Sequence, residues 1–249
     1  MVLHPGLKSV AAKVFPHFLL SWLDPVQEII DSDVREAAAA AREDHIILDA
    51  GAGEARHRKH FIRGRYLALD AGTGDPEWNY SGLDIQGDLE NLPLQSESVD
   101  CVLCMVVLEH TRNPHQVLKE FGRVLKDGGA LRLVVPFLWE EHQVPNDYFR
   151  FTRYGARLLF ETLPFRIDLV RPMGGFFWVC ARRSVNLLTF LQGGWRWIFF
   201  VLLAPIFGLL IPLALYFLDR LDGEKHYSLG FQIRATKNAA TNCTDSADS

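Results

Sequence analysis

Four short apolar runs, separated by polar and helix-like segments, dominate the first 140 residues. They are 46–48, 66–69, 99–107 and 131–135. Runs of this length that end in turn residues are typical of buried strands. Between the last two runs, residues 114–126 place apolar side chains at helical spacing, with Pro114 at the start and Gly128 just past the end. Strands that alternate with helices predict an α/β fold with a mainly parallel sheet and helices on both faces.

The same pattern divides the chain into five segments. We predict an N-terminal helical segment (1–45), an alternating core (46–170), a hydrophobic helical insertion (171–225), a strand that closes the core sheet (226–237) and a disordered polar tail (238–249). Apolar side chains with helical spacing support the first segment: Leu7, Val10, Val14 and Phe18.

The insertion contains a stretch from Trp197 to Leu218 without a charged residue. As a helix this stretch would be long enough to cross a bilayer. Pro205, Gly208 and Pro212 should break a straight helix, so we expect a helical hairpin or a pair of helices lying in the membrane interface. The alternative is an apolar cap on the sheet, but aromatic groups occur on all sides of the stretch, which exceeds one packing face.

Composition narrows the range of functions. The chain has 249 residues, a net charge of -4 and 49% hydrophobic residues, so it can bury a core and lacks the basic excess of a nucleic-acid-binding protein. Cys101 and Cys104 form a C-x-x-C within an apolar run. Their side chains should point to opposite faces of a strand, which favours buried thiols over a zinc or redox pair.

A glycine-containing turn follows the first apolar run. Asp49 ends that run, Gly51 and Gly53 come next, and Asp70 ends the second run. Glycines at this point allow a tight turn and close approach of a ligand to the backbone, and the second acid can accept hydrogen bonds from ribose hydroxyls. Arg56 stands where hydride-transferring dinucleotide proteins prefer a third glycine.

The order of these features resembles class I S-adenosylmethionine-dependent methyltransferases. The resemblance is carried by six segments: 48–53, 69–70, 87–94, 98–102, 107–110 and 120–129. It implies a Rossmann-like, seven-stranded, mostly parallel sheet whose last strand is antiparallel. It also implies S-adenosyl-L-methionine as the cofactor.

Carried over position by position, the resemblance implies a set of cofactor-binding residues. These are Asp49, Gly51, Gly53, Asp70, Asp88, Leu89, Met105 and Val106. The alternative for each acid is a strand-end residue that caps a turn. Ala55 occupies a position where the family often has a further glycine, and we expect this change to leave cofactor binding intact.

Two histidines are candidate general bases. His110 follows the third apolar run, and His142 lies in a polar, aromatic loop after the fourth. Each has an alternative: His110 as a packing residue at a helix start, and the His142 loop as a surface lid without chemistry. The same loop carries Asp147, Tyr148 and Arg150, which we expect to contact the acceptor. Glu140 and Glu141 beside His142 complete no ligand set with convincing spacing, so no metal is predicted.

Together these features predict a bacterial methyltransferase on the cytoplasmic face of a membrane, peripheral or re-entrant, acting on a small-molecule, lipid or glycan-precursor acceptor. A cytoplasmic protein is the alternative for location. A catalytically inactive membrane-associated scaffold or binding protein is the alternative for function. Nucleic acid is not expected as a partner, and the oligomeric state is left open.

Overall fold

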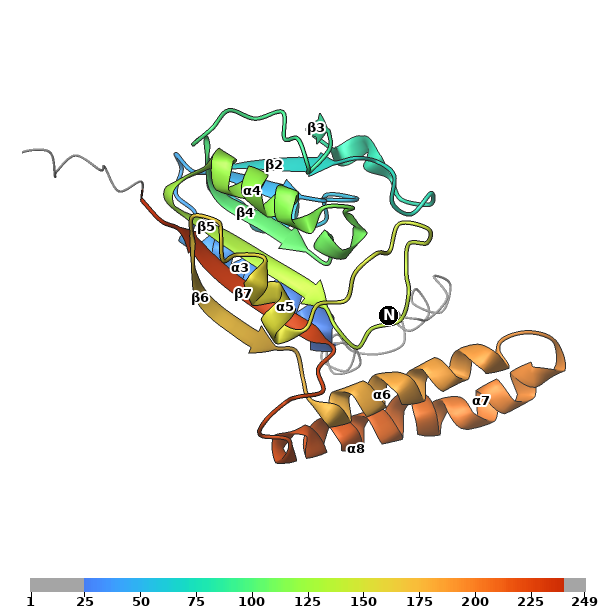
Figure 1. The fold of residues 1–249 in the computed structure, drawn as a ribbon. Coiled ribbons are helices and arrows are strands. Elements are labelled where there is room, and N and C mark those ends of the chain that lie inside the picture. The colour runs from blue at the N-terminus through green and yellow to red at the C-terminus, as the bar shows by residue number, and fades with distance from the viewer. Residues whose placement is uncertain (1–24, 240–249) are drawn as a thin grey trace, which may run out of the picture. The chain divides into compact units, whose positions relative to one another are not determined.

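The computed structural model describes residues 25–239, and their strands form one seven-stranded sheet (Figure 1). The strands are β1 (Ile46–Ala50), β2 (Arg65–Asp70), β3 (Ile85–Gln86), β4 (Val99–Met105), β5 (Leu125–Pro136), β6 (Phe165–Pro172) and β7 (Gly230–Lys237). Their order is β3-β2-β1-β4-β5-β7-β6. The pairs among β1 to β5 are parallel, and β7 runs opposite to β5 and β6 in Figure 1. This confirms the predicted fold class.

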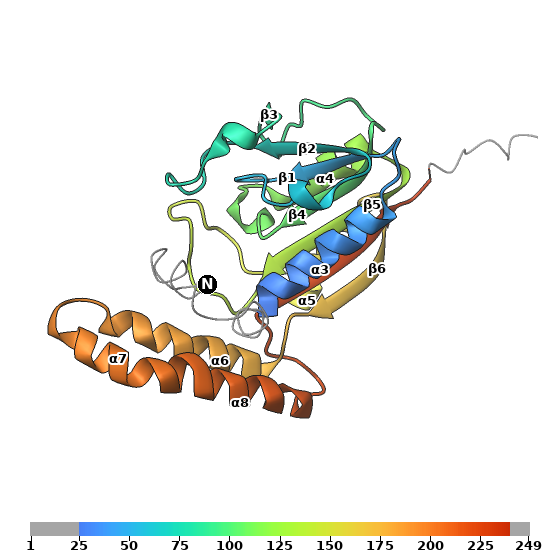
Figure 2. The ribbon, with the colours of Figure 1, turned by 180° about the vertical axis from the view of Figure 1, so that it is seen from behind.

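The described residues form six α-helices. They are α3 (Pro25–Ala40), α4 (Pro114–Val124), α5 (Arg153–Leu158), α6 (Phe176–Leu187), α7 (Trp197–Pro205) and α8 (Ile211–Leu218). Helix α4 lies on one face of the sheet, and the part of α3 from Val34 onward lies on the other (Figures 1 and 2). Ion pairs from Glu36 of α3 to Arg132 of β5 and to Arg234 of β7 hold that part of α3 in place, at 3.8 and 2.7 Å.

The core lies between the sheet and these helices. Ile47 and Leu103 of the central strands are at most 1% exposed, as is Phe121 of α4. Because both faces of a parallel sheet are covered, its strands read as continuous apolar runs, which is why the sequence located them. The short β3 went unpredicted, since Ile85–Gln86 has no apolar run to mark it.

The described residues divide into two compact units. The core unit comprises residues 34–135, 141–170 and 232–239, and the hairpin unit comprises 25–33, 136–140 and 171–231. Residues 1–24 of the predicted N-terminal helical segment and the part of the predicted tail beyond residue 239 lie outside the described residues.

Within the hairpin unit, the prediction for the uncharged stretch was wrong in its details. Residues 197–218 form one continuous helix through α7, a π turn (Ile206–Leu210) and α8, instead of breaking at the prolines. The hairpin arises because this helix pairs with α6, and the chain reverses in the intervening segment 188–196 (Figure 1).

The π turn and a serine of α6 explain how the helix tolerates Pro212. The N–H of Ile211 donates to the carbonyl of Ile206, five residues back. In the same register, the carbonyl of Phe207 would pair with residue 212, a proline without an N–H. The hydroxyl of Ser184 lies 3.1 Å from this carbonyl and 2.7 Å from that of Ala181, and shares its hydrogen between them.

We therefore expect Ser184→Ala to destabilise the protein by about 1 kcal/mol, because the Phe207 carbonyl loses its donor. Thr189→Ala is the matched control, since the Thr189 hydroxyl donates only to the carbonyl of Asn186, in its own helical segment. Urea unfolding followed by circular dichroism measures both. Equal stability of the Ser184 variant and the parent would show that this contact does not support the helix.

Candidate functional site

A loop with two left-handed glycines follows β1. Gly51 has φ +82° and Gly53 has φ +52°. A Cβ atom on Gly51 would lie 2.4 Å from the Val107 side chain, and one on Gly53 would lie 2.9 Å from the Trp78 ring. Conformation and space both require glycine at these positions. The contact with Val107 also brings the loop beside the end of β4.

Asp70, at the end of β2, holds this loop. One carboxylate oxygen accepts the backbone N–H of Gly53 at 2.9 Å, and the other accepts the N–H of Gly72 at 2.8 Å. The side chain is only half-buried, and each carboxylate oxygen has a second lone pair for a ligand. Asp70 thus combines a structural contact with a free acceptor at the carboxyl edge of the sheet.

Asp49 is held differently. It is 2% exposed and accepts a hydrogen bond from the hydroxyl of Tyr66 on the neighbouring strand. Burial raises the pKa of Asp49 to about 6, and the Tyr66 hydrogen bond only partly opposes this rise. Nothing in the sequence marked Tyr66, because its partner is set by the register of β1 against β2.

Two other residues near the loop have left-handed backbones without being glycine. Ala55 has φ +54° and Val106, just after β4, has φ +61°. This conformation costs roughly 1–2 kcal/mol in a residue with a Cβ, and it is especially unusual for a β-branched side chain. The structure therefore explains why a glycine suits position 55. Val106 is half-buried, and its neighbour Met105 is buried.

Two of the predicted cofactor-binding residues, Asp88 and Leu89, lie in the turn after β3. Leu89 is 7% exposed, whereas Asp88 is exposed and accepts the N–H of Glu90 at 2.9 Å. Asp88 thus stabilises a turn, as the capping alternative described, and retains a second oxygen for a ligand.

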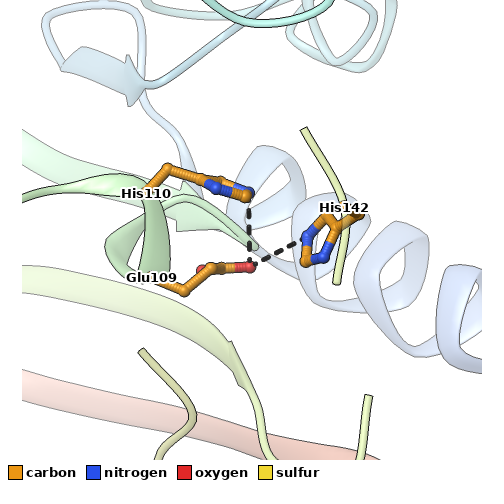
Figure 3. A group of neighbouring side chains, drawn as sticks. All are labelled: Glu109, His110 and His142. Atoms are coloured by element: carbon orange, nitrogen blue, oxygen red, sulfur yellow. Dashed lines mark ion pairs between the residues drawn. The ribbon is translucent and has the colours of Figure 1, made fainter. Parts of the chain in front are cut away.

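The two candidate bases lie together beyond β4 (Figure 3). The ring centroids of His110 and His142 are 4.7 Å apart in an edge-to-face arrangement. Between them lies Glu109, which is fully buried and directs Oε1 to Nε2 of His110 at 3.7 Å and to Nε2 of His142 at 3.4 Å. Sequence reasoning gave Glu109 no role, although it directly precedes His110. An acid next to a candidate base was the signal available.

The loop after β5 reaches this cluster through Glu109 and Asp147. The backbone N–H of Tyr148 donates to the carbonyl of Glu109 at 2.9 Å. Asp147 accepts two hydrogen bonds of 2.6 Å from Arg150 and one of 2.8 Å from the N–H of His142. Burial opposes ionisation of Asp147, but these bonds, Arg150 first, outweigh it and lower its pKa to about 2. Asp147 and Arg150 therefore fix the loop, while Tyr148 is 38% exposed.

The two cysteines of the C-x-x-C lie on β4 as free thiols. Cys104 is buried and Cys101 is half-buried. Burial raises the pKa of Cys104 well above its ordinary value, so this thiol stays protonated at neutral pH.

Comparison with known proteins finds similarity at the level of family model and fold. Residues 48–133 match the family model described as a methyltransferase domain. A 37.1 kDa uncharacterised protein in transposon Tn4556 of Streptomyces fradiae is 44% identical over 50 residues, which are 20% of this chain and 14% of that protein. The chain spans less than half the length of the curated relatives it matches.

Two of the solved structures that share the fold are similar over most of the chain. A chain in the complex between the Haloferax volcanii Trm112 methyltransferase activator and a protein assigned as a methyltransferase has a TM-score of 0.54 at 18% identity, over 91% of this chain and 100% of that one. The [4+2]-cyclase SpnF has a TM-score of 0.53 at 17% identity, over 84% and 80%. Residues 48–133 thus match a methyltransferase-domain model, and the described residues share the fold of these solved structures.

The buried Asp49 carboxyl predicts a pH-dependent stability. Its folded pKa of about 6 exceeds the ordinary value of 3.8, so the folded state holds the proton more tightly and stability falls as pH rises through this interval. Asp49→Asn removes the ionisation and keeps an acceptor for Tyr66. As the pH rises from 5 to 7.5, the unfolding free energy of the parent should fall relative to that of this variant. The difference between the two proteins should grow by about 1–2 kcal/mol over that interval.

Urea unfolding of both proteins at the two pH values measures the gain. Because other groups titrate equally in both proteins, the difference isolates Asp49. A constant difference across this range would contradict the raised pKa.

Proposed function

We propose that this protein transfers a methyl group from S-adenosylmethionine to a small-molecule, lipid or glycan-precursor acceptor at a membrane surface. The observation that carries the cofactor assignment is the glycine loop tied to Asp70 at the carboxyl edge of the sheet. In open α/β sheets, ligands bind at this edge, where the strand order reverses. Here the reversal falls between β1 and β4.

The residues present fit such a cofactor. Side chains at Gly51 and Gly53 would collide with their neighbours, so the backbone stays bare on this loop. Asp70 offers a carboxylate lone pair to ribose hydroxyls. Met105 ends β4, the strand whose end borders the loop, and Val106 follows it. The sulfonium supplies the activated methyl group when bound. The task of the chain is then to hold the acceptor in line with that methyl group.

The cluster of Glu109, His110 and His142 supports a hydroxyl or amine acceptor that must lose a proton. Each imidazole directs Nε2 toward Glu109 and uses Nδ1 for other contacts. A ring nitrogen in this position can take up an acceptor proton, and the adjacent carboxylate stabilises the imidazolium that forms.

The hairpin unit supports a membrane-bound location. By length and composition alone, the helix Gly194–Leu221 could cross a membrane, with a mean hydropathy of 2.7 and 11% burial in its most apolar window. Helix α6, which pairs with it, carries Arg182 and Arg183 and is not apolar enough to return across a bilayer. A hairpin that lies along one leaflet places the apolar helix in the membrane without carrying α6 across it. This arrangement also keeps β6 and β7 in one compartment.

A second candidate, an inactive scaffold or another reaction on this fold, also has support. The resemblance to SpnF is to a protein described as a cyclase, so the fold alone does not dictate methyl transfer. Cofactor binding and methyl transfer must therefore be measured separately.

We expect isothermal calorimetry to detect S-adenosylmethionine binding, and Asp70→Asn to weaken it at least about 10-fold through loss of a charged acceptor. Asp44→Asn, on the exposed side chain that pairs with Arg42, is the matched control and should bind like the parent. Absence of binding by the parent, or equal binding by the Asp70 variant, would contradict the cofactor assignment. Incubation of lipid extract with a radiolabelled methyl donor then identifies the acceptor.

The membrane assignment predicts co-flotation with vesicles of anionic phospholipid. Ile198 and Leu202 are 66% and 63% exposed on one face of α7. The double variant Ile198→Glu/Leu202→Glu should lose flotation because two charges cannot enter the apolar layer. Leu158→Glu, in α5 and 63% exposed, should float like the parent.

Failure of the parent to float would defeat the membrane assignment. Flotation of the double variant would show that this face does not meet lipid. Self-association of the parent that the double variant lacks would assign the face to a second copy of the chain.

A further inference from the structure

Glu109, His110 and His142 have the spacing of ligands that share one ion. Glu109 Oε1 lies 3.4 Å from His142 Nε2 and 3.7 Å from His110 Nε2, beyond the usual range of a hydrogen bond. Two ligands about 2.0–2.2 Å from one ion at tetrahedral angles lie roughly 3.3–3.6 Å apart. One ligand atom from each of the three residues lies within 4.8 Å of the others, and Figure 3 shows both rings turned toward the carboxylate.

Contacts on the far side of each ring orient the histidines. Nδ1 of His110 lies 2.7 Å from the backbone carbonyl of Asn146, and Nδ1 of His142 lies 3.4 Å from a carboxylate oxygen of Asp147. A ring that donates its Nδ1 hydrogen presents a lone pair at Nε2. This is the arrangement that metal-binding histidines use, with a carboxylate or carbonyl behind the ring.

Glu109 supplies an independent observation. Its side chain is fully buried, and neither carboxylate oxygen has a hydrogen-bond partner among the described residues. A buried carboxylate without donors is costly, and a cation close to it removes that cost. Arg150 pairs with Asp147 at 2.6 Å, and its charge also acts on Glu109 without a hydrogen bond to that carboxylate.

We propose that Glu109, His110 and His142 bind one divalent transition-metal ion, of which Zn²⁺ is the representative. Two imidazoles and one carboxylate suit this class of ion, whereas Mg²⁺ and Ca²⁺ prefer oxygen ligands throughout. Three protein ligands leave a coordination position for water or for an acceptor hydroxyl, whose pKa the ion would lower. With an ion bound, Nε2 of each ring is occupied, so the ion would activate the acceptor in place of an imidazole base. No metal was expected from the sequence because the acids beside His142, Glu140 and Glu141, complete no ligand set. Glu109 meets His142 only through the fold.

This inference does not depend on methyl transfer. Metal-free protein, prepared with a chelator, is titrated with Zn²⁺ in the calorimeter and with Co²⁺ in a visible spectrophotometer. We expect one equivalent of each ion to bind, and Co²⁺ to give the absorption of a four- or five-coordinate site. S-adenosylmethionine binding, measured on the same samples, tests the proposed function separately.

Variants locate the ion. Glu109→Gln and His142→Ala should each weaken Zn²⁺ binding by more than the 10–100-fold typical of losing an outer contact, and Asp147→Asn by about 10–100-fold. His115→Ala is the control and should bind like the parent, since this exposed residue contacts Thr162 and lies outside the cluster. Thermal unfolding without metal identifies any variant that fails to fold.

Absence of one-equivalent binding by the parent would overturn the proposal, as would equal affinity of the folded His142→Ala protein. Should Glu109→Gln fail to fold, His142→Ala decides, because His142 lies in a loop and is only half-buried.

Discussion

Strand β1 hydrogen-bonds to β2 on one side and to β4 on the other, and all three strands run in the same direction. Parallel strands end at the same edge of a sheet, so segments far apart in the sequence must meet there. The glycine loop after β1, Asp70 after β2 and Glu109 after β4 share this edge for that reason. The close approach of Gly51 to Val107 shows how tightly the ends of β1 and β4 are packed.

How far the sequence predicts this molecule depends on whether a feature is local or tertiary. Buried strands and the glycine turn are local, so the fold class and the positions of Asp49 and Asp70 followed from pattern and spacing. The Tyr66–Asp49 hydrogen bond depends on strand register, and the meeting of His110 with His142 depends on how a long loop folds back. Neither has a signature in one segment, so only the structure reveals them.

The hairpin unit shows a local rule overruled by tertiary contacts. Pro205 and Pro212 predict breaks because each lacks an N–H, yet the helix continues. At Pro212, a π turn shifts the hydrogen-bond register by one residue. Ser184 on the neighbouring helix then donates to the Phe207 carbonyl, which has no N–H partner at the proline. The sequence showed both prolines, but the donor comes from another helix and is not apparent from the stretch itself.

Glu109 contributes to both the fold and the chemistry of the site, the first through its backbone carbonyl and the second through its carboxylate. Its backbone carbonyl accepts the N–H groups of Tyr148 and Phe149 at 2.9 and 3.3 Å, which fixes the loop after β5 against the end of β4. That docking brings His142 to the Glu109 carboxylate. A buried carboxylate is tolerated only where positive charge or donors reach it. The loop therefore brings both an imidazole and the charge of Arg150 to the buried acid, so these contacts depend on the loop conformation.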